Sequence, residues 1–311
     1  MELQLSAPIP LQRNSMEYDV GMHNGKRYGI FEFEKDFGTE KQCLKLIFES
    51  LHNYGCSCGG TYKLLGGRRQ YQCSKCRLKI SPTAGTIFHK SHAPITKWFL
   101  AIFLFANAKS GLSANQLQRN LNITYKAAWR MLFLIRKGLP QGNNFLSGVV
   151  ETDAAYFGGR HPAGKNNERL SESFAAKSVV LGAVERGGKV KLKVSPNARA
   201  RSIYRFLDRN VNPITSTLMT DKSNSYIRAP YTRYAVNHRK KEYVRGNVYV
   251  NTMDAFWSHV KRSVSGTHKV VSKKHLQSYL DGFAFHYNNR RSDRERFFAL
   301  LGSVLPNAKS K

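Results

Sequence analysis

Acidic residues are scarce in this sequence. Only 20 Asp and Glu stand against 50 Lys and Arg, which leaves a formal net charge of +30 over 311 residues. A charge of this size does not determine a fold, but it predicts a polyanionic partner, and nucleic acid is the commonest one. An apolar fraction of 41% with 12% aromatic residues is enough for a sizeable core, which excludes a disordered basic tail.

Cysteine and long hydrophobic runs are also in short supply. Five cysteines, an odd number, exclude a disulfide-rich secreted scaffold. The most apolar stretch, residues 98–108, is far shorter than the roughly 20 residues that a membrane span requires. Residues 1–14 have no apolar core of signal-peptide length, so we expect a chain that stays in a reducing compartment beside its polyanion.

The sequence of the first half of the chain predicts helices on both sides of a cysteine cluster. Residues 1–35 are polar and aperiodic, which indicates a flexible arm. Residues 41–51 have apolar side chains at helical spacing, and residues 95–107 are nearly all apolar, which predicts a buried helix. Glycine, proline and asparagine in residues 138–147 mark a domain boundary.

Two helices before that boundary form a candidate helix-turn-helix. Residues 113–120 predict a short helix, and Thr124 reads as the N-cap of a second helix that runs to Lys137. A turn of about three residues between them, followed by an amphipathic helix with basic flanks, fits a DNA-binding unit. Many other helix pairs share this pattern.

The second half changes to a mixed α/β pattern. Strands are expected at residues 149–154, 179–184, 189–194, 216–220 and 231–237, and helices at 202–210, 252–264 and 273–289. This order predicts a mixed sheet with packed helices, and we interpret residues 292–311 as a basic tail.

Four cysteines have the clustering of a structural zinc site. Cys73 and Cys76 have the standard two-residue spacing, whereas Cys56 and Cys58 are separated by one residue and make a strained knuckle. In a reducing compartment such a cluster favours metal over disulfide, and four reduced cysteines without metal are the alternative. Cys43 lies on an apolar helix and is interpreted as a small buried residue.

Three aspartates stand out among the few acids. Asp153 lies in an apolar strand, Asp221 ends another strand, and Asp254 opens a helix. Two divalent ions about 4 Å apart need such carboxylates for in-line attack on a phosphodiester, and magnesium prefers oxygen ligands. Taken singly, the three could instead be a satisfied buried acid, a turn residue and a favourable acid at a helix N-terminus.

The motifs around these residues resemble a known family. The sequence is similar to DDE transposases of bacterial and archaeal insertion sequences, the ISXO-like group, which is related to eukaryotic Merlin elements. The resemblance covers about residues 40–291. It is carried by YQCSKCRLKISPTAGTIFHKSHAPITKWFLAIFLFANAKSGLSANQLQRNL, ETDAAYFGG, MTDKSNSY and VNTMDAFWSHVKRSVSGTHKVVSKKHLQSYLDGFAFHYNNR.

The resemblance implies an RNase H-like catalytic domain that cuts transposon ends and joins the freed 3′-hydroxyl to target DNA. Asp153, Asp221 and Asp254 would be its catalytic carboxylates and would hold two Mg²⁺, with Mn²⁺ as a substitute. Lys261 would contact DNA near the cleaved bond. The implied divisions are a helix plus zinc ribbon at 36–90 with one Zn²⁺, a helix-turn-helix domain at 91–140 and the catalytic domain at 148–291.

Further residues are expected to bind DNA or to support the site. The expected DNA contacts are Arg68, Arg69, Arg77, Lys79, Lys126, Arg130, Arg136, Lys261 and Arg262. The candidates for supporting the carboxylates are Glu151, Asn251, which could also cap its helix, and His268. The implied partners are double-stranded DNA, as transposon ends and target, and at least a second copy of the chain. The implied location is the cytoplasm at the nucleoid, or the nucleus in a eukaryotic host.

The sequence departs from the family pattern at four points. Asp254 replaces the usual Glu, Ala154 replaces an acidic residue, and Gly282 stands where a Glu is common. The first zinc knuckle would normally place a ligand at Gly55. These departures leave two alternatives open: a catalytically inactive, domesticated DNA-binding protein, or a zinc-ribbon nuclease or resolvase of RNase H-like fold.

Overall fold

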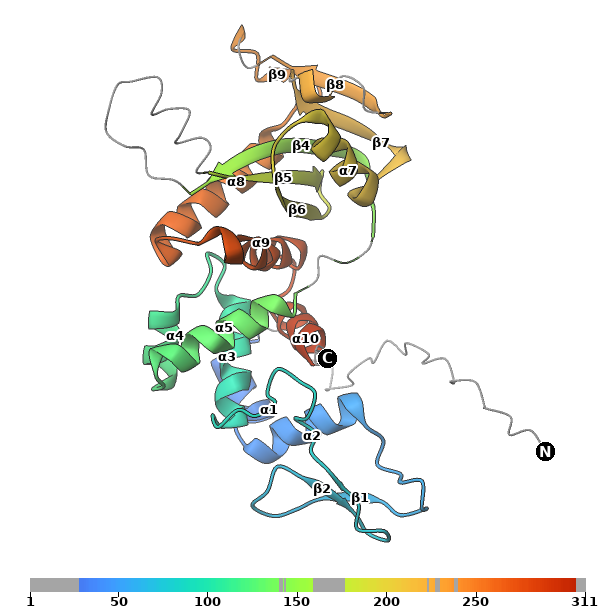
Figure 1. The fold of residues 1–311 in the computed structure, drawn as a ribbon, viewed down its shortest axis with the longest axis vertical. Coiled ribbons are helices and arrows are strands. Elements are labelled where there is room, and N and C mark those ends of the chain that lie inside the picture. The colour runs from blue at the N-terminus through green and yellow to red at the C-terminus, as the bar shows by residue number, and fades with distance from the viewer. Residues whose placement is uncertain are drawn as a thin grey trace, which may run out of the picture.

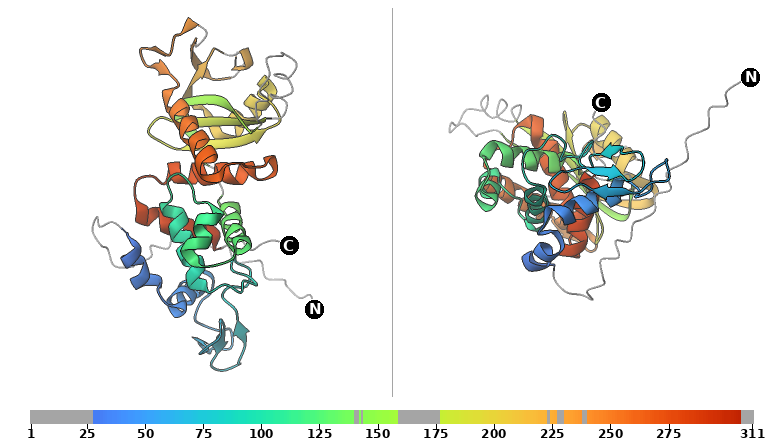
Figure 2. Two further views of the ribbon diagram at one scale, coloured as in Figure 1. Left: turned by 90° about the vertical axis from the view of Figure 1, so that its left-hand side faces the viewer. Right: turned by 90° about the horizontal axis from the view of Figure 1, so that it is seen from below.

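The chain forms an elongated molecule with a small sheet at one end, helices in the middle and a larger sheet at the other end (Figures 1 and 2). None of the helices in the described part of the chain is both long and apolar enough to span a membrane. The computed structural model describes residues 28–139, 142, 144–158, 177–222, 224–226, 230–237 and 240–305.

Six helices share one hydrophobic cluster in the middle of the molecule. They are α1 (Ile30–Phe37), α2 (Glu40–Leu51), α3 (Ile95–Asn107), α4 (Ala114–Leu121), α5 (Tyr125–Lys137) and α10 (Asp293–Val304). Helix α3 is the most apolar of them and is buried, as its sequence predicts. Ser113 and Thr124 accept hydrogen bonds from the first turns of α4 and α5, so the two predicted helix starts are confirmed.

Two of these helices correct the sequence interpretation of the chain ends. Helix α1 overlaps the last residues of the expected arm, and α10 lies within the expected basic tail. Phe297 of α10 is fully buried and packs against Phe33 of α1 and Phe103 of α3. Burial of these aromatic rings stabilises both ends of the chain against α3, although basic and polar residues surround them in the sequence.

The small sheet is antiparallel, with β2 between β1 and β3. Its strands are β1 (Tyr62–Leu64), β2 (Tyr71–Cys73) and β3 (Lys79–Ile80). Tyr71 stacks on Phe48 of α2 with ring centroids 3.8 Å apart, so this sheet is anchored to the helices by an aromatic contact.

The large sheet has five strands in the order β6-β5-β4-β7-β8. Strands β4, β5 and β6 are antiparallel neighbours, whereas β7 and β8 run parallel to β4. This mixed sheet fits an RNase H-like domain and confirms the expected mixed α/β class. The strands are β4 (Leu146–Phe157), β5 (Ser178–Glu185), β6 (Val190–Ser195), β7 (Val211–Asp221) and β8 (Thr232–Val236).

Helices cover both faces of this sheet (Figure 1). Helix α7 (Ala200–Asn210) packs on one face, while α8 (Asn251–Ser263) and α9 (Lys273–Asn288) pack on the other. Gly182 of β5 allows the close approach of α8, because a Cβ there would collide with Met253 and Trp257. A short hairpin of β9 (Val244–Arg245) and β10 (Val248–Tyr249) precedes α8.

Candidate active site

Two of the three aspartates lie side by side at one end of the large sheet. Glu151 of β4 is paired with Met219 of the parallel strand β7. Asp153 and Asp221 each lie two residues further along these strands, so they share a row and a face of the sheet. Helix α8 packs on that face and carries Asp254 in its first turn.

The charges of the three carboxylates interact. Burial, together with the nearby charges of Asp221 and Asp254, raises the pKa of Asp153 to about 6. The backbone N–H of Ala154 and the indole of Trp257 act in the opposite direction. Asp153 therefore lies within electrostatic range of both other aspartates, and a cation between them would relieve their repulsion.

Glu151 fixes the position of the helix that carries Asp254. Its side chain is fully buried, and Oε2 accepts a hydrogen bond of 3.0 Å from the backbone N–H of Met253. Oε1 accepts another of 2.9 Å from the hydroxyl of Thr252. Val250 at the N-cap of α8 has no side-chain hydrogen bond to the helix, so the Glu151 carboxylate from β4 satisfies one of its unpaired backbone donors, the N–H of Met253.

Arg186 completes this attachment. Its Nε lies 2.7 Å from Oε1 of Glu151, and its two terminal nitrogens donate to the carbonyls of Asn247 and Tyr249, each at 2.9 Å. The guanidinium also lies 3.6 Å from the centroid of the Tyr249 ring. Arg186 is not among the residues expected from the sequence, because it lies in a glycine turn after β5 and belongs to no recognisable motif. We call Glu151, Arg186 and the first turn of α8 the β4–α8 clamp.

Two other supporting residues are placed differently from our expectation. Asn251 is the first residue of α8 and is exposed, so it does not cap the helix, and Glu151 takes that role. His268 packs edge-on against Tyr279 and lies against Gly111, where a positive φ and the lack of a Cβ permit the contact. Burial and the charge of Arg136 lower the pKa of His268 to about 4, which favours the neutral ring.

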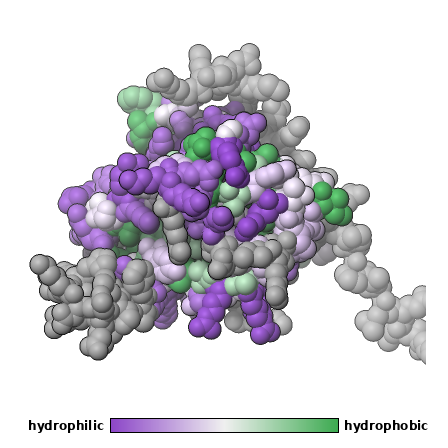
Figure 3. All heavy atoms as spheres, turned by 90° about the horizontal axis from the view of Figure 1, so that it is seen from above, coloured by the Kyte–Doolittle hydropathy of each residue, from purple (hydrophilic) through white to green (hydrophobic). Residues whose placement is uncertain are grey.

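Basic side chains surround the acidic end of the sheet. Lys261 and Arg262 are exposed on α8, and Lys261 lies two turns after Asp254 on the same side of the helix. Lys222, which follows Asp221 in the sequence, lines one pocket together with Arg233, Arg245 and the acid Glu242. Figure 3 shows that hydrophilic side chains cover most of the coloured surface at this end of the molecule.

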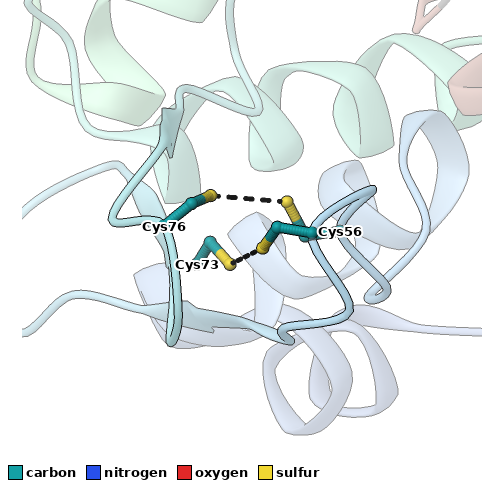
Figure 4. A group of neighbouring side chains, drawn as sticks. Cys56, Cys73 and Cys76 are labelled. Carbon is teal, nitrogen blue, oxygen red and sulfur yellow. Dashed lines mark hydrogen bonds between the residues drawn. The ribbon is translucent and has the colours of Figure 1, made fainter.

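The four cysteines converge between two loops of the small sheet (Figure 4). Their sulfur atoms all lie within 4.8 Å of one another, with 3.6 Å between Cys56 and Cys76 and 3.4 Å between Cys58 and Cys73. Four thiolates about 2.3 Å from a central ion would show separations of this size, so the donor set fits a tetrahedral Zn²⁺. The short Cys56–Cys58 spacing does not prevent both from joining the cluster.

The aspartates are not gathered as tightly as the cysteines. Within the described residues, the cysteine cluster alone brings at least three metal-ligating side chains together in this way. The three carboxylates are therefore close enough for their charges to interact, but their oxygen atoms are not gathered around a single point as the four sulfur atoms are.

Some of the basic residues expected to bind DNA are exposed, whereas others make contacts within the protein. Arg69 is half-buried, pairs with Glu40 at 2.6 Å and donates to the carbonyl of Ser91. Arg136 corrects our expectation of a surface contact, because it is buried, stacks on Tyr279 and donates to the carbonyl of Leu112. Exposed side chains are those of Arg68, Arg77, Lys79, Lys126, Arg130, Lys261 and Arg262.

Zinc content provides a test of the cysteine cluster. We expect the purified chain to hold about one zinc ion, and Cys73→Ser to lose most of it because four sulfur ligands become three. Elemental analysis of the purified protein measures this. Cys43→Ser is the matched control and should retain the metal, since Cys43 is buried in α2 outside the cluster. A metal-free wild-type chain after purification with zinc would contradict the assignment.

The raised pKa of Asp153 predicts a pH-dependent stability difference. Asp153→Asn should stabilise the metal-free chain near neutral pH, because ionising a carboxyl whose folded pKa is about 6 rather than 3.8 disfavours the folded state. A shift of this size corresponds to at most about 3 kcal/mol. The gain should shrink as the pH falls from about 6 towards 4, as thermal unfolding can show. Asp208→Asn, an exposed acid on α7, should change little. Equal melting of wild type and Asp153→Asn at neutral pH would contradict this.

Comparison with known proteins agrees with this site. Residues 145–288 match the family described as ISXO2-like transposase domain, a span that contains the whole five-stranded sheet and all three aspartates. The chain is also 26% identical over 300 residues to a Halobacterium salinarum protein described as "Uncharacterized protein in transposable element ISH50". That similarity covers 87% of this chain and 99% of the relative. These two similarities support an insertion-sequence transposase, with the ISXO2-like transposase match lying in the domain at residues 145–288.

Proposed function

We propose that this chain binds the terminal repeats of its element, cuts the DNA at their ends and joins the freed 3′-hydroxyl to target DNA. The observation that supports this most directly is the electrostatic coupling of Asp153 to both Asp221 and Asp254 at one end of the sheet. Acids rarely share such a position in a chain of net charge +30 unless they have a cationic partner.

The three carboxylates would hold two Mg²⁺, for which Mn²⁺ could substitute. When bound, the two ions would activate the attacking oxygen and stabilise the leaving oxygen of an in-line displacement. The chain's own contribution is to position the ligands. Asp153 and Asp221 are fixed by the pairing of β4 with β7, and Asp254 is fixed by the β4–α8 clamp. Aspartate at the third position makes this helix placement more important, since its side chain is shorter than glutamate.

Basic residues near the acids would hold the DNA backbone. Lys261 and Arg262 project from α8, and Lys222 and Arg245 line the pocket next to Asp221. Such phosphate contacts fix the register of the duplex without reading its sequence. Their number makes binding depend strongly on salt.

The small sheet and the α4–α5 pair would recognise the terminal repeats. Helix α5 follows α4 after a turn of three residues, which is the spacing of a helix-turn-helix, and it exposes Lys126 and Arg130 near its N-terminus. Arg68, Arg77 and Lys79 are exposed on the zinc ribbon. We further propose that two chains act together, one at each end of the element.

Cleavage of a terminal-repeat duplex tests the proposal. We expect Mg²⁺-dependent nicking at the repeat end by wild type, and a loss on the order of 10³-fold or more for Asp153→Ala, Asp221→Ala or Asp254→Ala, because each removes a metal-holding charge. The substrate is the inverted repeat that brackets the gene, and product lengths are read on a sequencing gel. Asp208→Asn, remote on α7, should cut like wild type.

The same assay separates the alternatives. Equal binding of the duplex by wild type and Asp153→Ala with no cutting in Mg²⁺ or Mn²⁺ would identify a catalytically inactive DNA-binding protein. A preference for a four-way junction over the linear repeat would identify a nuclease or resolvase. Either result contradicts the proposed transposition chemistry.

A further inference from the structure

A pocket between the proposed DNA-reading helix and the catalytic domain has aromatic walls. It lies where α5 faces the segment before α9, has a volume of ≈ 260 Å³, and is distant in the fold from the cysteine cluster. Its lining residues are Trp129, Phe133, Arg136, Val270, Val271, Ser272, His275, Ser278 and Tyr279. None of these carries a negative charge.

Two aromatic side chains of this pocket stack on each other. The rings of Trp129 and Phe133 are nearly parallel, with an angle of 6° and centroids 5.3 Å apart. His275 meets both rings edge-on, at 5.7 Å and 5.5 Å. A ring face of this stacked pair that opens to the pocket suits stacking of another planar ring, with His275 and Ser272 available to hydrogen-bond its edge.

These apolar groups are exposed to an unusual degree. Trp129 is 38% exposed and Val270 is 84% exposed, whereas Trp98 and Trp257 are buried. Trp129 packs on Phe133 and His275 and still leaves part of its ring exposed at the pocket.

Positive charge surrounds the pocket on both sides. Lys126 and Arg130 are exposed on α5, and Lys269, Lys273 and Lys274 are exposed on the opposite lip. Residues 50–150 contain no Asp or Glu, and neither do residues 255–280. A peptide or lipid tail would suit the apolar wall alone, but a wall of aromatic rings between rows of cations matches a nucleotide, which has a planar base and an anionic backbone.

We propose that this pocket binds a nucleobase of an unpaired nucleotide, whose phosphates contact the lysines and arginine on its two lips. Trp129 supplies the stacking surface. The proposal rests on the proposed DNA binding, and it adds a base-binding site at the junction of the DNA-reading helices and the catalytic domain. A base held there would be removed from its duplex, because stacked and paired bases cannot enter a pocket.

Tryptophan fluorescence gives a direct test with the full-length protein. Because Trp98 and Trp257 are buried, quenching by a stacked base should come from Trp129. We expect a labelled single strand of about 10 nucleotides, and a duplex with one extrahelical base, to quench the emission as they bind. A strand of the same length made of abasic nucleotides keeps the phosphates and should not quench. Fluorescence anisotropy of the labelled DNA measures binding separately.

Two variants separate stacking from folding. Trp129→Ala should abolish the quenching and weaken binding of the base-containing strand by about 5- to 100-fold, with little effect on the abasic strand. Trp129→Phe should also abolish the quenching but retain most of the affinity, because phenylalanine still offers a ring. Zinc content and circular dichroism confirm that both variants fold.

Four results would overturn the inference. The first is equal quenching by the abasic strand, and the second is quenching that persists in Trp129→Phe. The third is binding of DNA without any change in tryptophan emission. The fourth is Trp129 fluorescence that acrylamide does not quench in the free chain, because the ring would then be inaccessible. The third result can be told apart from failure of the proposed DNA binding, because in that failure the anisotropy measurement would show no binding of DNA. In that case both proposals fall together.

Discussion

A buried carboxylate that holds a helix to a strand is the contact on which the acidic site depends. Glu151 accepts hydrogen bonds from Thr252 and Met253 at the start of α8 and is paired with Arg186. Sheet pairing places Asp153 beside Asp221, and this clamp fixes the first turn of the helix that carries the third acid, whose apolar side packs on the sheet. Removing one partner of such a buried pair typically costs about 3–5 kcal/mol, because the other charge is left uncompensated. The clamp therefore positions Asp254 without contacting substrate.

Acidic residues are absent from a long stretch of the chain that precedes the acidic site. Residues 50–150, which include the small sheet with its four cysteines and the α4–α5 pair, contain no acid at all. The first acid after this stretch is Glu151, followed two residues later by Asp153. The part of the chain that we propose to read DNA therefore carries positive charge and no acid, whereas the buried Glu151 is paired with Arg186. Separation of the two signs allows one polyanion to be held while its backbone is presented to the carboxylates.

Helix caps and apolar periodicity in the sequence predict individual helices and strands well. They do not predict contacts between residues that are distant in the sequence. Thr124 predicted the start of α5 because a cap acts within one turn. Arg136 was assigned to the surface although it follows Leu132 by four residues and so lies on the buried side of α5. Helix α10 was missed even though Ser292 caps it, because the surrounding composition is basic. Arg186 could not be found, since it reaches Glu151 only through the register of β4 and β5. The three aspartates and Glu151 stand out in the sequence, whereas the partner of Glu151, Arg186, does not.

Binding of Mn²⁺ to a chain with a broken clamp tests this account most directly. Glu151→Gln removes the ion pair with Arg186 while keeping a side chain of similar shape, and Glu242→Gln removes a partly exposed pair with Arg245 as the matched control. Titration followed by electron paramagnetic resonance reports the affinity, and zinc content confirms that the rest of the chain is folded. The account predicts that Glu151→Gln weakens Mn²⁺ binding by about tenfold or more, whereas Glu242→Gln leaves it unchanged. Wild-type affinity in Glu151→Gln would contradict it.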